Sequence, residues 1–229
     1  FRSGYTLLDR SKKSQHASFQ NFSGQPFGAS PKGVAASFAS ASTNRALCGV
    51  PVLSGTGDFT IAAWVNPLSL SGTVIEFYIA GNYGASNLTG VEINGYNGKF
   101  GCYCSSGATF FSTATFTAGV WTHVCATRQA GLISLYLNGV FDSSATRSGS
   151  IGTSRNWCIG NGPDYTAGHG GSITDVGVWS RSLTAGEVSE LYRLDGGGLG
   201  RLLTQRAQRR VFRTATGNRR RRLICGAEC

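Results

Sequence analysis

The sequence predicts an all-β fold with one short helix near its C-terminal end. Gly accounts for 33 of the 229 residues, and only 14% of the residues are charged. Short apolar runs are separated by Gly, Ser, Asn and Pro, which is the composition of many short strands joined by tight turns. Within several of these runs apolar and polar residues alternate, as in a strand with one buried face. A chain of this length is ordinary for a single all-β domain.

Alternation locates the strands. Over residues 59–65 the odd-numbered positions are Phe, Ile, Ala and Val, which share one face, while Trp64 points to the other face and Pro67 ends the strand. Further strands are predicted over residues 5–12, 33–38, 73–79, 90–94, 99–104, 108–111, 121–128, 131–138 and 172–179. A polar segment rich in Gly, Ser and Pro separates the first two of these.

Two tight turns are predicted. Residues 128–131 connect the strands of the clearest hairpin, which covers residues 121–138. Asn138–Gly139 is the strongest turn dipeptide in the chain, and a return strand is expected to begin at Val140.

One helix is signalled after the last strand. Thr184 and Glu187 have the spacing of a capping box, in which the hydroxyl and the carboxylate each accept a backbone N–H of the other residue. The apolar residues that follow are spaced to share one helix face, namely Val188, Leu191 and Tyr192. Three consecutive glycines, residues 196–198, are expected to end the helix.

Charge divides the chain into two parts: a β-sandwich domain, residues 1–195, and a Gly hinge with an Arg-rich C-terminal arm, residues 196–229. The whole chain carries a net charge of +10, and residues 199–229, with nine Arg and one Glu, account for +8 of it. Arg holds carboxylates and phosphates through two parallel hydrogen bonds, so the arm is predicted to anchor the protein to a partner. The expected anchor residues are Leu199, Leu202, Leu203, Arg206, Arg209, Arg210, Arg213, Arg219, Arg220, Arg221 and Arg222.

The cysteine pattern gives no metal motif. Seven cysteines are present: Cys48, Cys102, Cys104, Cys125, Cys158, Cys225 and Cys229. Their spacing does not match a zinc site. Cys102 and Cys104 share a strand face and cannot bridge each other without distorting the strand. We expect small buried apolar residues, with one or two disulfides as an alternative.

Neither end of the chain shows a targeting segment. No run approaches the roughly eighteen apolar residues that span a membrane, and no signal peptide is visible at the N-terminus. Since the sequence contains no Met, Phe1 is not expected to be the initiating residue.

Several motifs resemble those of laminin-G-like, concanavalin A-like jelly rolls, which are common in bacterial surface proteins and phage virion proteins. The segments that carry the resemblance are Thr6–Ser11, Phe59–Pro67, Trp121–Val124, Leu135–Gly139 and Gly171–Val188. The resemblance covers about residues 5–193, and the first strand looks truncated. It implies a two-sheet antiparallel jelly-roll sandwich in which Trp64, Trp121 and Trp179 are core or rim aromatics.

The resemblance also implies what to expect of metals. Some members of this family bind calcium through a Phe-Asp-Gly segment, but here the matching residues 38–44 lack the acids. We therefore expect no cofactor. A partial calcium site that uses Asp164 and Asp175 remains an alternative.

Catalysis is not expected. Related glucanases carry their carboxylates as Glu-x-Asp-x-x-Glu on one strand, and this chain has no such run. His16, His123 and His169 do not belong to any motif with a nucleophile.

The sequence therefore predicts a non-catalytic structural or binding protein. The main expectation is an oligomeric component of a virion or surface assembly, such as a capsid-decorating subunit, that contacts other protein subunits through the arm. Contact between the arm and nucleic acid is a further possibility for Arg219–Arg222. The alternative function is a secreted lectin-like adhesin, located outside the cell or on its surface, that binds surface glycans. Its ligand residues would be Tyr83, Tyr96, Asp164 and Tyr165, which stand beside polar residues in loops predicted from the sequence.

Overall fold

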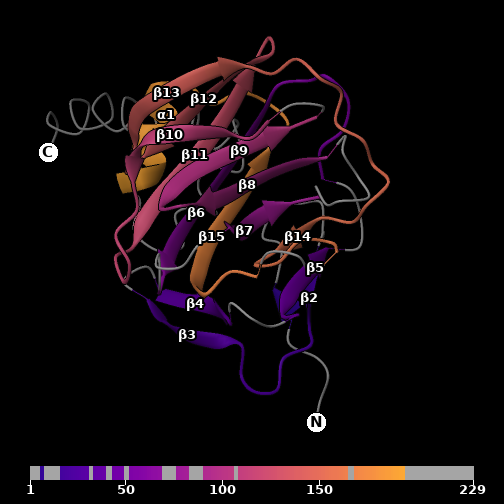
Figure 1. Cartoon of the computed structure of the whole chain (residues 1–229), viewed down its shortest axis with the longest axis vertical. Helices are drawn as coiled ribbons and strands as arrows, with labels where there is room; N and C mark the ends of the chain where they lie inside the picture. Colours follow the sequence, from indigo (N-terminus) through magenta and orange to yellow (C-terminus); the bar gives the residue numbers. More distant parts are fainter. Residues whose placement is uncertain are drawn as a thin grey trace, which may run out of the picture.

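The computed structural model describes residues 6–7, 16–30, 33–39, 43–48, 52–68, 76–82, 90–105, 108–164 and 168–193. This part of the chain forms two antiparallel sheets packed face to face, so the predicted all-β sandwich is confirmed (Figure 1). The first sheet, sheet A, has the order β1 (Thr6–Leu7), β2 (Ala17–Gln20), β5 (Arg45–Cys48), β14 (Cys158–Ile159), β7 (Glu76–Gly81), β8 (Val91–Tyr96), β9 (Lys99–Cys104) and β10 (Phe110–Thr115). The second, sheet B, has the order β13 (Val140–Thr146), β12 (Leu132–Leu137), β11 (Thr122–Gln129), β6 (Phe59–Pro67), β15 (Gly171–Trp179), β4 (Gly33–Phe38) and β3 (Phe27–Ser30).

Most predicted strands are confirmed within a few residues, and β4 and β9 have the predicted bounds. The prediction that only a polar segment lies between the first two strands is wrong, because β2 and β3 lie there. The short strands β5 and β14 were not predicted either. Of the strand predicted over residues 5–12, only Thr6–Leu7 lies within the described residues.

The core lies between the sheets and is built by the predicted alternation. Phe59, Ile61 and Val65 of β6 point inward and are almost fully buried, against Ile93 of β8 and Phe100 of β9. Burial of each such side chain contributes about 1.5–3 kcal/mol. The buried face of each strand therefore holds the two sheets together and leaves the outer faces for other contacts.

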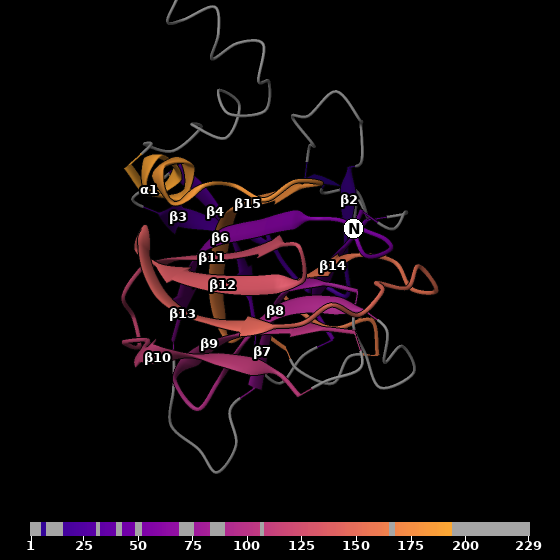
Figure 2. The ribbon, with the colours of Figure 1, turned by 90° about the horizontal axis from the view of Figure 1, so that it is seen from above.

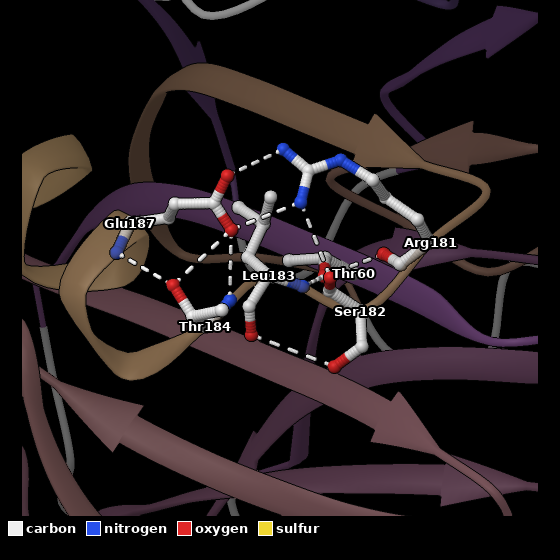
Figure 3. A network of polar contacts seen from close by, with 6 residues as sticks. All are labelled: Thr60, Arg181, Ser182, Leu183, Thr184 and Glu187. Atoms are coloured by element: carbon white, nitrogen blue, oxygen red, sulfur yellow. Dashed lines mark hydrogen bonds and ion pairs between the residues drawn. The ribbon is translucent and has the colours of Figure 1, made fainter. Parts of the chain in front are cut away.

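The outer face of sheet B is covered by the predicted helix, α1 (Ala185–Arg193) (Figure 2). Its capping box is present: the Thr184 hydroxyl accepts the backbone N–H of Glu187 at 3.2 Å, and the Glu187 carboxylate accepts the N–H of Thr184 at 2.9 Å (Figure 3). Arg181 binds the same carboxylate at 2.8 Å. The Thr60 hydroxyl of β6 accepts the N–H of Leu183 and donates to the carbonyl of Arg181, which fixes the segment before the helix to the sheet.

The C-terminal end of α1 is also fixed to sheet B. The ring of Tyr192 stacks on Trp64 with centroids 5.5 Å apart. A Cβ at Gly139 would lie 2.9 Å from the Cβ of Tyr192, so the predicted Asn138–Gly139 turn, confirmed by positive φ at both residues, lies directly beside the helix. Trp64 is largely buried on the outer face, as the alternation predicted, and α1 ends on this side of the sandwich.

Arg128 is not a turn residue, contrary to the prediction. It lies within β11, and the two-residue turn that follows is Ala130–Gly131, both with positive φ. The Arg128 side chain is fully buried, with its guanidinium 4.9 Å from the ring centroid of Phe59. It donates hydrogen bonds to the carbonyls of Gly55, Gly57 and Gly149 and to the thiol of Cys104.

An aromatic cluster closes the end of the sandwich where β2 faces β3 and β4. The rings of Phe19, Phe22, Phe27 and Phe38 contact one another, and His169 packs edge-on against Phe38. Burial lowers the pKa of His169 to about 4, so its imidazole is neutral at pH 7. This environment agrees with the expectation that His169 belongs to no nucleophile motif.

The five cysteines within the described residues are buried free thiols: Cys48, Cys102, Cys104, Cys125 and Cys158. The alternative of one or two disulfides is therefore wrong for these five, and their interpretation as small buried apolar residues is confirmed. Within the described part of the chain, no helix is long and apolar enough to cross a membrane.

Candidate functional site

The outer face of sheet A presents a row of polar and aromatic side chains. Because Ile93, Phe100 and Cys102 point into the core, their neighbours on the same strands point away from it. The register places Tyr96 opposite Lys99 and Gly101 opposite Phe111, so these four positions form one patch across β8, β9 and β10. The other outward residues of β8 and β9 are Glu92, Asn94 and Tyr103.

Two aromatic rings form the open part of this patch. Tyr96 and Phe111 are both half-buried, and their ring centroids lie 5.5 Å apart with 33° between the ring planes. We call this pair the Tyr96–Phe111 platform. Since each ring keeps part of its surface accessible while its position is fixed by a strand, the platform offers a rigid apolar surface for a flat ligand.

The platform depends on a glycine between the two rings. A Cβ at Gly101 would lie 2.8 Å from the ring of Phe111 and 2.5 Å from the side-chain oxygen of Asn94. Both distances are shorter than van der Waals contact, so only glycine lets Phe111 lie across β9. The geometry of the platform therefore depends on a glycine at residue 101 as well as on the two rings.

A polar pair lies next to the platform. The amide of Asn94 donates to the carboxylate of Glu92 at 2.6 Å, and the two side chains are only 1% and 2% exposed. This hydrogen bond fixes the orientation of Asn94, whose oxygen faces Gly101. Glu92 therefore acts within the sheet as a partner of Asn94.

Lys99 is the exposed cation of the patch. The turn Asn97–Gly98, with φ of 48° and 74°, joins β8 to β9, so Tyr96 and Lys99 are directly opposed across the hairpin. Directly opposed side chains on one sheet face have Cβ atoms about 5 Å apart. The Lys99 side chain thus starts beside the phenol ring of Tyr96.

Of the four ligand residues predicted from the sequence, only Tyr96 lies on this platform. It belongs to β8, so the prediction that residues 94–96 form a loop is wrong. Tyr83 and Tyr165 lie outside the described residues, as do all the predicted anchor residues from Leu199 to Arg222.

Asp164 is placed elsewhere on sheet A. Its carboxylate forms an ion pair with Arg155 at 3.0 Å, and Arg45 of β5 donates to the neighbouring carbonyl of Pro163. β5 is three strand positions from β8, about 14 Å across the sheet. Asp164 and Tyr96 therefore do not form one site.

Asn82 does not support the predicted loop site either. It is fully buried, donates to the carbonyl of Gly152 and accepts the N–H of Val91, which is a structural role.

No group of three or more His, Cys, Asp or Glu side chains is arranged to hold a metal ion within the described ranges. Asp164 already has Arg155 as its partner, and Asp175 lies in an irregular part of β15 with φ of 49°. The partial calcium site considered from the sequence stays a prediction.

Sequence reasoning missed Phe111, Lys99 and Gly101. Residues 96–99 contain the signal, because Tyr-Asn-Gly-Lys is a two-residue hairpin with Asn-Gly in the turn. With that turn recognised, Tyr96 and Lys99 follow as a cross-strand pair. Phe111 requires the register between β9 and β10, which the sequence does not give.

Two antiparallel sheets packed face to face, with a short helix on one outer face, define a jelly-roll sandwich. The chain belongs to the concanavalin A-like lectin/glucanases superfamily, whose family model matches residues 39–189. The resemblance seen in the sequence is thus confirmed. A search of curated protein sequences gave no match.

Similar solved structures agree with this fold. Domain 4 of AbnA, an extracellular arabinanase from Geobacillus stearothermophilus solved in complex with arabinotriose, is 19% identical with a TM-score of 0.60, over 76% of this chain and 84% of that one. The binding domain of Paraclostridial Mosquitocidal Protein 1 is 16% identical with a TM-score of 0.61, over 82% and 50%. A carbohydrate-binding protein from Bacteroides ovatus, named as putative, is 18% identical with a TM-score of 0.55, over 68% and 46%. At these identities the likeness establishes the fold alone.

Proposed function

We propose that this protein is a non-catalytic carbohydrate-binding domain whose ligand lies on the Tyr96–Phe111 platform. The observation that carries the proposal is the pair of half-buried rings held across Gly101 on the outer face of sheet A. A pyranose ring has apolar C–H faces that pack against aromatic rings and hydroxyl groups that need polar partners. The arabinotriose complex of a similar domain supports a saccharide as the ligand.

The carboxylates near the platform favour binding over hydrolysis. A retaining glycosidase needs two carboxyl groups about 5 Å apart that both reach the substrate. Two acidic residues share this face of β7 and β8: Glu76, which is opposite Tyr96 in the register, and Glu92, which is 2% exposed and hydrogen-bonded to Asn94. The Glu92 carboxylate orients its neighbour and has little access to a glycosidic bond, so the pair that hydrolysis needs is incomplete.

The test is glycan binding by variants of the platform. Wild-type protein, Tyr96→Ala and Phe111→Ala would be applied to an array of neutral and acidic glycans, and the strongest ligand would be titrated calorimetrically. Each truncation is expected to weaken binding at least tenfold, about 1.4 kcal/mol. Phe141→Ala is the matched control, because Phe141 is an aromatic residue on β13 of sheet B with 54% exposure. Equal loss in the control, or full binding by both platform variants, would contradict the proposal.

A second function is favoured by the opposite side of the molecule: attachment to other subunits of a virion or surface assembly. α1 lies on the outer face of sheet B, while β9 and β10 lie on the other side of the sandwich (Figure 2). Beside the end of α1, Val140 and Phe141 are 69% and 54% exposed, and these two adjacent apolar side chains offer a small surface that a partner can cover. A protein attached by this side would present the Tyr96–Phe111 platform outward.

Sedimentation of the full chain and of a chain truncated after Gly198 tests this second function. The described core ends at residue 193, so the truncated chain is expected to fold. The full chain is expected to sediment as an oligomer, and the truncated chain as a monomer. Attachment through Arg contacts should weaken as salt rises, whereas apolar contacts should resist salt. Monomeric behaviour of both chains at every salt concentration would refute attachment between copies through the arm.

A further inference from the structure

We infer that the Tyr96–Phe111 platform selects acidic saccharides, those with a carboxylate or sulfate group next to the ring that stacks. This inference rests on the proposed function and adds the class of its ligand. The observation behind it is the position of Lys99, whose backbone is held directly opposite Tyr96 by the two-residue turn Asn97–Gly98.

The hairpin limits where the Lys99 ammonium can lie. Opposed Cβ atoms about 5 Å apart and a side chain of four methylene groups place the ammonium within reach of the rim of the Tyr96 ring. An anionic group on a sugar that stacks on Tyr96 would then lie within ion-pair distance. A neutral sugar would receive only the stacking and hydrogen bonds.

Two acidic residues near Lys99 are engaged by other groups. Glu92 is buried and bound to Asn94. Asp142, on the neighbouring strand β13, accepts the backbone N–H groups of Thr113 and Ala114 and the hydroxyl of Ser143. Within the described residues the ion pairs are Arg155–Asp164 and Arg181–Glu187, so the exposed Lys99 keeps its charge available for a ligand.

The positive charge lies on the β9 side of Tyr96, and Glu76 of β7 is paired in register with Tyr96 on its other side. On β10, Thr115 is the cross-strand partner of Lys99 and is exposed and uncharged. Its hydroxyl group can donate to the same anion without competing for Lys99. A ring on the platform, an ammonium at its rim and a hydroxyl group beyond it are the features that an acidic saccharide requires.

The test uses pairs of ligands that differ only in the charge. The pairs are sialyllactose and lactose, trigalacturonate and its methyl ester, and sulfated and unsulfated lactose, each titrated calorimetrically against the full chain. At least one acidic member is expected to bind about two- to fivefold more tightly than its neutral partner, the range for one solvent-exposed charged contact. The three pairs distinguish a sialic acid, a uronic acid and a sulfate as the source of the anion.

Variants assign the preference to Lys99. Lys99→Gln should abolish the difference between acidic and neutral partners while retaining neutral binding, and Lys99→Arg should keep the difference. Arg193→Gln, at the end of α1 on sheet B, is the matched control for loss of one exposed positive charge. Equal affinity for both members of every pair, or an unchanged preference in Lys99→Gln, would overturn the inference but leave the proposed function standing. Failure to bind any glycan on the array would instead overturn the proposed function, and this inference with it.

Discussion

Replacing Arg128 by Met tests the main structural argument for how this sandwich keeps a charge in its core. The side chain is fully buried, and its donors are bound by the carbonyls of Gly55, Gly57 and Gly149 and by the thiol of Cys104. Met has a similar length but no donors, so the carbonyls of Gly57 and Gly149 would lose a donor, whereas the carbonyl of Gly55 would keep the N–H of Ile151. Losing hydrogen bonds to a charged group costs about 1.5–3 kcal/mol.

Urea unfolding followed by tryptophan fluorescence measures this loss, since Trp157 is buried in the folded protein. With a slope of about 2 kcal/mol per molar urea, the midpoint of Arg128→Met should fall by about 0.8–1.5 M. Arg147→Met is the matched control, because Arg147 donates to the carbonyls of Ala108 and Thr146 near the surface, and it should cost less than about 1 kcal/mol. A midpoint for Arg128→Met within 0.5 M of wild type, roughly 1 kcal/mol at that slope, would refute the reasoning.

Two further predictions concern titratable groups in the core. Burial raises the pKa of Cys102, Cys104 and Cys125, and raises that of Cys158 to about 11. In a Cys225→Ser/Cys229→Ser variant, the remaining thiols should therefore react with Ellman's reagent only after the protein unfolds. Rapid reaction of two or more thiols in the folded protein would contradict this prediction. Burial lowers the pKa of His169 from 6.5 to about 4, so the unfolded state binds the extra proton and the free energy of unfolding should fall by about 2 kcal/mol between pH 7 and pH 5. His169→Gln should reduce this dependence of the free energy of unfolding on pH, while a variant of the exposed His16 should not. An unchanged pH dependence in His169→Gln would show that His169 is not its source.

The strand pattern was predictable where one strand face meets the core and the other does not. Residues 59–65 alternate because Phe59, Ile61 and Val65 point into the core between the sheets, whereas Thr60, Ala62 and Trp64 point to the outer face of sheet B. The strands that were missed have four residues or fewer, too few to show a period, and β3 lies at a sheet edge with a Gly in its middle. Short strands of this kind form because neighbouring strands pair with them, and their own sequence contributes little.

The helix could be predicted in more detail than any strand because its signals are local. Thr184 and Glu187 are three residues apart, and their mutual hydrogen bonds need no other part of the chain. The salt bridge from Arg181 and the contact with Thr60 were not predictable, since Thr60 lies more than one hundred residues earlier in the sequence.

The candidate site was only partly predictable for the same reason. Tyr96 was chosen as an aromatic residue beside polar ones, which is a local pattern. Its partner Phe111 reaches it through the register between β9 and β10, and the space for that contact exists because residue 101 has no side chain. The need for a glycine at residue 101 cannot be recognised from the composition or from the alternation of apolar and polar residues.

The two outer faces of the sandwich determine whether both proposed functions are compatible. Sheet B carries α1 on its outer face, with Tyr192 stacked on Trp64. Sheet A carries the Tyr96–Phe111 platform on its own outer face. Because the two proposed functions would use opposite surfaces, neither excludes the other, and loss of one should leave the other intact. If deletion of the arm abolished glycan binding, the two functions would share a surface, and the platform would have to be sought on sheet B.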